Sequence, residues 1–194
     1  MSGLGRGVVA AVLVCGLASS AFAQGQGRRG GGPPPTAPTI TSLAGDVQAD
    51  WTALREQMVA AADAMPADKF DYKSTPAQRT FGEQVMHVVQ VNGFLFGTLK
   101  GKTPAPAINM MAKSKADVVA ALRQSMEYGE ALTKEFSDAQ LTERVTPPPF
   151  MGTQASRIRL IYGLVGHTQD IYGQMAVYLR LNGVTPPASA RGGM

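Results

Sequence analysis

The chain has 194 residues, of which 44% are hydrophobic and 16% charged, and its formal net charge at pH 7 is +4. The excess of positive charge belongs to the terminal segments. Four of the 18 Lys and Arg residues lie outside residues 39–187, which leaves 14 basic residues there, and all 14 Asp and Glu residues fall within that range. Nucleic-acid binding needs a basic face on the folded domain. The charge distribution therefore excludes nucleic acid from the expected partners.

Residues 1–23 have the composition of an export signal. Arg6 supplies the positive charge, residues 7–22 are uncharged and mostly apolar, and Ala21-Phe22-Ala23 gives a small-x-small cleavage pattern. The apolar run is shorter than the roughly 18–20 residues of a membrane-spanning helix. We therefore expect a cleaved, exported product, periplasmic or secreted, with no stable membrane insertion. Cys15 is the only cysteine, so cleavage would exclude disulfides and Cys-ligated metal sites.

Residues 24–38 consist mainly of Gly, Pro, Arg and Gln, and residues 188–194 have a similar character. Segments of this composition have little to bury, so we expect a disordered linker before the domain and a flexible tail after it. The intervening residues 39–187 are enough for one domain with a single core.

Apolar residues in residues 39–187 recur mainly at helical spacing. The first predicted helix runs from about Ser42 to Met65, where Trp51, Leu54 and Met58 are three and four residues apart. Such spacing places the three side chains on one face of the helix. This face is expected to enter the core.

The second predicted helix begins at Thr80, because Thr80 and Glu83 can form a capping box in which each side chain binds the other's backbone amide. It ends near Lys100-Gly101. The third predicted helix begins near Ser114 and continues to Phe136. Proline-containing loops separate these helices.

The fourth predicted helix starts between Thr153 and Ser156 and ends at Asn182-Gly183. Gly173 within it is expected to allow a close helix–helix approach, since an interior glycine otherwise destabilises a helix by up to about 1 kcal/mol. No segment predicts a strand. Four long helices joined by loops predict an all-α four-helix bundle.

The sequence has two histidines, His87 on the second predicted helix and His167 on the fourth. Metal sites in helical bundles are built in the core from side chains on facing helices, and imidazole is a common ligand of zinc, iron and nickel. A histidine on an apolar helix face is also often a core residue. In that interpretation Glu83 and Asp170 are the expected hydrogen-bond partners. The residues alone leave both interpretations open.

Three segments resemble the DinB family, also known as the DinB/YfiT-like superfamily of metal-dependent enzymes. They are Met65-Pro-Ala-Asp-Lys-Phe-Asp-Tyr-Lys-Ser-Thr-Pro, Arg79-Thr-Phe-Gly-Glu-Gln-Val-Met-His87-Val, and the segment from His167 through Tyr-Gly-Gln, Tyr-Leu-Arg and Asn-Gly to Pro-Pro. The resemblance runs in order over about residues 42–189. It implies a four-helix bundle of the DinB/YfiT-like type in which three His ligands hold a divalent metal, commonly zinc or nickel.

The resemblance assigns the first two ligand positions to His87 and His167, and the third falls on Ile171. An aliphatic side chain has no lone pair to donate, so the metal-binding motif is degenerate. The candidate substitutes for the third ligand are Asp170 and Glu83. In the alternative, Asp170 is a hydrogen-bond partner of a liganding histidine.

Two classes of function follow from this resemblance. The first is a metal-dependent hydrolase or transferase with an incomplete three-His site; export fits the hydrolase better, because the family's transferases use cytoplasmic thiols. The alternative is a non-catalytic bundle with structural histidines, which binds a small apolar ligand or a partner protein in a cleft lined by Val91, Phe94, Ile171 and Met175. The sequence identifies neither the small molecule nor the partner. By family analogy, the candidate assembly is a homodimer.

Overall fold

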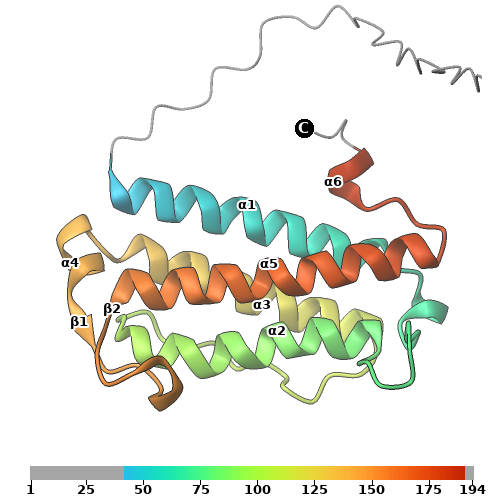
Figure 1. Cartoon of the computed structure of the whole chain (residues 1–194), viewed down its shortest axis with the longest axis horizontal. Helices are drawn as coiled ribbons and strands as arrows, with labels where there is room; N and C mark the ends of the chain where they lie inside the picture. Colours follow the sequence, from blue (N-terminus) through green and yellow to red (C-terminus); the bar gives the residue numbers. More distant parts are fainter. Residues whose placement is uncertain (1–41, 191–194) are drawn as a thin grey trace, which may run out of the picture. The chain divides into compact units, whose positions relative to one another are not determined.

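The structure, a computed structural model, describes residues 42–190. The predicted signal peptide and linker lie outside the described residues. Four long helices pack together into a bundle (Figure 1), and this arrangement confirms the predicted all-α class. Their bounds are α1 (Leu43–Ala64), α2 (Phe81–Phe96), α3 (Lys115–Lys134) and α5 (Arg157–Leu181).

Short elements lie in the connections between the long helices, and one more, α6, follows the last long helix. The two strands pair antiparallel, with Arg144 opposite Ser156 and Val145 opposite Ala155. The sequence predicted no strand, and this prediction was wrong, because β1 and β2 form one small antiparallel pair. The flexible tail was expected from residue 188, whereas a last short helix extends to Ala190. The short elements are η1 (Ala67–Lys69), η2 (Gly97–Leu99), α4 (Asp138–Thr142), β1 (Arg144–Val145), η3 (Pro149–Met151), β2 (Ala155–Ser156) and α6 (Pro187–Ala190).

Side-chain caps fix the start of three of the long helices. Ser42 accepts from the amide of Gly45, and Ser114 accepts from the amide of Asp117. The predicted capping box at α2 is present: the amide of Thr80 donates to Glu83 at 2.7 Å, and the amide of Glu83 donates to the Thr80 hydroxyl at 3.1 Å. Each cap satisfies amides that the first turn of a helix leaves free.

The tightest packing lies where α1, α2 and α3 meet around Trp51. The indole N–H of Trp51 donates to the carbonyl of Met126 at 2.9 Å, and its ring packs edge-on against Phe96 with 5.7 Å between centroids. A Cβ atom on Gly129 would lie 2.2 Å from the Trp51 ring. Gly129 therefore permits the close approach of α3 to Trp51 of α1. The expectation for Gly173 was wrong, since a Cβ there would meet nothing within 4 Å.

Helices α2 and α5 run antiparallel along a shared seam. Gln84 of α2 contacts Gln174 of α5, and one turn later His87 contacts His167. The partner on α5 thus moves back toward its N-terminus as the chain advances along α2. No helix within residues 42–190 is long and apolar enough to cross a membrane.

Candidate functional site

The fold brings the two histidines into direct contact. The Nε2 atoms of His87 and His167 are 3.1 Å apart, and the rings meet edge to face with 4.9 Å between centroids. Both side chains are half-buried. The two histidines were predicted on separate helices, and these helices present them to each other.

Helix geometry puts Ile171 beside this pair. His167, Ile171 and Gln174 are four and three residues apart, so they occupy successive turns of one face of α5. Ile171 is only 3% exposed. The residue at the third ligand position therefore belongs to the hydrophobic core, between the His87–His167 contact and the Gln84–Gln174 contact.

The surroundings favour neutral imidazoles. Burial lowers the pKa of His87, and the nearby Arg79 and His167 lower it further. Burial also lowers the pKa of His167; it outweighs the opposing effect of Asp170, and Arg79 makes a smaller contribution in the same direction as burial. A neutral imidazole keeps a lone pair that can accept a hydrogen bond or bind a metal.

Glu83 and Asp170 make other interactions. Glu83 accepts from the backbone of Thr80 in the α2 cap, and this hydrogen bond is the main cause of its lowered pKa. Asp170 accepts from the side-chain amide of Gln174 at 3.1 Å. Among residues 42–190 no group of three His, Cys, Asp or Glu side chains lies close enough together to hold a metal ion.

The second nitrogen of His167 is also informative. Its Nδ1 is buried and has no hydrogen-bond partner among the described residues. A metal-ligating histidine usually donates its other ring N–H to a carboxylate or a carbonyl. Asp170, the candidate for that role, does not form this bond here and interacts with Gln174 instead.

The separation of the two imidazoles fits a shared ion. Two nitrogens that bind one tetrahedral zinc at about 2.0–2.1 Å are about 3.3 Å apart, close to the observed 3.1 Å. The same distance suits an N–H···N hydrogen bond in which one neutral imidazole donates to the other. The donor set thus fits a divalent metal with two protein ligands and does not supply a third.

One polar contact of the seam was not predicted from the sequence. Gln84 donates to Gln174 at 2.6 Å, and Gln174 in turn donates to Asp170. The available signal was a glutamine among the apolar residues of the core-facing side of α2. Gln84 Oε1 is buried without a partner, so this end of the seam keeps an unused acceptor.

The predicted apolar cleft does not form around its four expected residues. Ile171 and Met175 are buried in the core, Val91 is half-buried, and Phe94 is 61% exposed. A side chain so exposed and two buried ones do not line one cavity. Phe94 instead contributes to the outer surface of α2.

Comparisons with known proteins agree with this architecture. A model of the DinB superfamily matches residues 29–175. A DinB-like protein from Bacillus cereus ATCC 10987 superposes with a TM-score of 0.58 at 20% identity, over 77% of this chain and 98% of that chain. A DinB-like protein from Bacillus subtilis superposes with a TM-score of 0.58 at 18% identity, over 72% and 93%. A search of curated proteins finds no match.

Proposed function

Because the chain belongs to the DinB superfamily, we propose that His87 and His167 form a two-histidine site for a divalent metal, zinc or nickel. Members of this superfamily are often metal-binding. The observation that carries the proposal is the 3.1 Å separation of the two Nε2 atoms across the α2–α5 seam. Two helices that are far apart in sequence thereby bring one ring nitrogen each to within 3.1 Å of the other.

The chain's own contribution is to hold these nitrogens neutral and close together. Burial lowers the pKa of both imidazoles, so the lone pairs are available near neutral pH. The antiparallel register of α2 and α5 fixes the separation. A bound divalent metal would supply Lewis-acid chemistry. Of the two reaction classes, hydrolysis suits an exported protein better than thiol transfer. Export to the periplasm or the exterior, and assembly as a homodimer, are part of the proposal.

One observation favours the second candidate function, a non-catalytic bundle. Ile171 occupies the third ligand position as a core residue, and two neutral imidazoles at 3.1 Å can satisfy each other with a single hydrogen bond. The histidines are then structural. In this candidate function the bundle binds an apolar molecule or a partner protein.

Metal content distinguishes the two candidates. The chain is purified without chelator and without a nickel column, then titrated with zinc and with nickel by calorimetry. We expect one metal per chain, bound with only micromolar affinity, because a two-ligand site has about half the donors of a complete site. The variants His87→Asn and His167→Asn should each lose most of this binding.

If the two histidines are structural and bind no metal, the opposite result is expected. Wild type and both variants would then bind zinc equally weakly, and added zinc would leave the melting temperature of the wild type unchanged. That outcome would overturn the metal site and leave the binding bundle as the function to pursue.

A further inference from the structure

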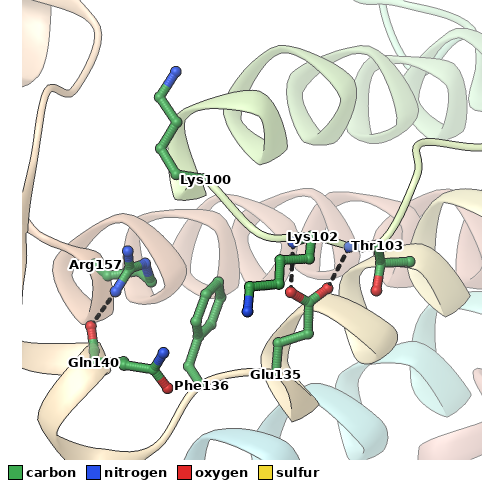
Figure 2. Close-up of a pocket in the computed structure, with 7 residues that line it drawn as sticks. All are labelled: Lys100, Lys102, Thr103, Glu135, Phe136, Gln140 and Arg157. Carbon is green, nitrogen blue, oxygen red and sulfur yellow. Dashed lines mark hydrogen bonds between the residues drawn. The ribbon is translucent and has the colours of Figure 1, made fainter.

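A cavity lies at the end of the bundle where α2 finishes and α5 begins. Its volume is about 450 Å³, and Figure 2 shows the residues around it. Arg157 lies ten residues before His167 on α5, about 15 Å along the helix axis, so this cavity is separate from the histidine pair. The lining residues are Lys100, Lys102, Thr103, Glu135, Phe136, Gln140 and Arg157.

Arg157 is held rigidly at the cavity wall. The residue is only 7% exposed. Its Nε donates to the carbonyl of Leu99 at 2.8 Å, its Nη1 donates to the carbonyl of Gln140 and contacts the Glu143 carboxylate, and its guanidinium lies 4.5 Å from the centre of the Phe136 ring. Its Nη2 makes no hydrogen bond within residues 42–190. A fixed guanidinium with a free N–H group is a preorganised donor for oxyanions.

The loop on the opposite wall is equally fixed. Both carboxylate oxygens of Glu135 accept backbone N–H groups, one from Lys102 at 2.5 Å and one from Thr103 at 2.7 Å. Gly101 permits this approach, because a Cβ there would lie 2.4 Å from Leu132. Burial alone would raise the pKa of Glu135, but these hydrogen bonds outweigh burial and hold the pKa below its usual value. The acid of the cavity is thus engaged by the loop backbone.

Two lysines at the mouth have no such partner. Neither the ammonium group of Lys100 nor that of Lys102 lies within 4.0 Å of a carboxylate among the described residues, whereas the guanidinium of Arg157 pairs with Glu143 at 3.1 Å. Lys100 also has a φ of +56°, the left-handed conformation that normally favours Gly or Asn at the end of a helix. Residues in such conformations cluster at functional sites, so a lysine at this position indicates a functional role for its charge.

We infer that this cavity binds the oxyanion group of a small molecule, a carboxylate or a phosphate, through the cations that line it, Lys102 and Arg157. In the view of Figure 2 the Phe136 ring stands between these two side chains. The lining carries three cations and one carboxylate, although the domain as a whole is formally neutral. The ring offers an apolar surface for the rest of the molecule, whereas the ammonium of Lys100 points away from the other lining side chains in Figure 2.

The test follows the amide signals of Lys102 and Thr103 by nuclear magnetic resonance in the full chain. Inorganic phosphate and benzoate are titrated separately at constant ionic strength, with sodium chloride as the control salt. We expect saturable shifts with phosphate, with benzoate, or with both. Saturation by phosphate alone assigns a phosphorylated molecule, and saturation by benzoate alone assigns a carboxylate. No saturation with either, or equal shifts with chloride, overturns the inference.

Matched lysine variants locate the binding. Lys102→Gln should weaken the saturable binding by about fivefold, since an exposed ion pair contributes up to about 1 kcal/mol. Lys113→Gln removes the same charge from an exposed residue outside this cavity and should leave the affinity unchanged. Equal effects of the two variants would show that the anion responds only to net charge. Arg157→Lys keeps the charge, loses the planar fork and is expected to weaken binding as well.

Discussion

The core around Trp51 is built from closely packed apolar groups, whereas the seam between α2 and α5 carries contacts between polar side chains. Helix α2 contributes to both regions. Around Trp51 an aromatic pair and a glycine pack so closely that no added atom would fit. Along the seam, two histidines and two glutamines contact one another, and Gln84 and His167 each keep a buried polar atom without a partner.

The two regions differ in role: the packing around Trp51 stabilises the bundle, and the polar atoms of the seam are available to a ligand. Close packing around Trp51 specifies one arrangement of α1, α2 and α3, because any change of volume there forces other atoms to move. Unsatisfied buried polar atoms destabilise a fold, and they are the groups that a ligand can still satisfy. We therefore assign the stability of the bundle to the core around Trp51, and we place the proposed metal site at the seam.

The largest expected effect comes from adding a third histidine ligand to the His87–His167 pair. Ile171→His adds an imidazole one turn after His167 and beside the existing pair. Zinc affinity should rise by roughly a hundredfold or more, since each ligand of a complete site contributes several kcal/mol. Zinc calorimetry measures the gain. In the metal-free protein this variant should be less stable than the wild type, because it buries a polar ring in place of an apolar side chain.

A control separates this geometry from a simple gain of histidine. Val177→His places the same side chain on α5 at a position that is half exposed and away from the pair. It should leave zinc affinity at the wild-type level. If Ile171→His behaves like this control, the alignment of the third ligand position with Ile171 is wrong.

The next largest effect is expected from a substitution that disrupts the packing of the core around Trp51. Gly129→Ala puts a methyl group 2.2 Å from the Trp51 ring and 2.7 Å from Phe96. Overpacking of this kind destabilises a fold by about 1–3 kcal/mol, more than the helical preference of Ala over Gly can offset. Urea unfolding followed by circular dichroism measures the change.

Gly173→Ala is the matched control for this experiment, because it makes the same substitution on the seam helix where the new atom meets nothing within 4 Å. The improved helix propensity should stabilise the protein by up to about 1 kcal/mol. A loss of stability at Gly173 as large as that at Gly129 would contradict the contrast between the two regions.

The smallest effect concerns the pH dependence of stability in the metal-free protein. Burial lowers the pKa of His87 and His167 below the ordinary value of 6.5. The unfolded chain then binds more protons than the folded chain, so the free energy of unfolding falls as pH decreases below about 6.5. Urea unfolding between about pH 7.5 and pH 5.5, in the presence of a chelator, measures this loss.

The double variant His87→Gln, His167→Gln removes both titrating rings and should flatten the slope over the same pH range. Its remaining pH dependence belongs to the carboxylates. An unchanged slope would mean that the pair does not link protonation to folding.

The sequence predicted the helices well because their signals are local. The capping box of Thr80 and Glu83 depends on residues within one turn and is present in the structure. The helices predicted to begin near Ser42 and Ser114 begin at Leu43 and Lys115. The hairpin of β1 and β2 escaped prediction because two-residue strands have no detectable period. Gly173 and Gly129 look alike in sequence, and only the neighbouring helix decides which one permits close packing.

The candidate sites were harder to predict for the same reason. The residue types and the family resemblance pointed to His87 and His167, but their contact depends on the register between α2 and α5. The contact of Gln84 with Gln174 depends on that register too. The cavity at Arg157 combines segments from the ends of α2 and α3 with α4 and the start of α5, and nothing in the local sequence marks this convergence.

The burial of Trp51 has a practical consequence. It is the only tryptophan of the chain, and it is fully buried with its N–H bound to α3. Its fluorescence emission should therefore lie at short wavelength in the folded bundle and shift to longer wavelength on unfolding. The protein thus carries an intrinsic optical reporter of the α1–α3 contact, which lets fast-mixing experiments time the docking of these helices without any added label.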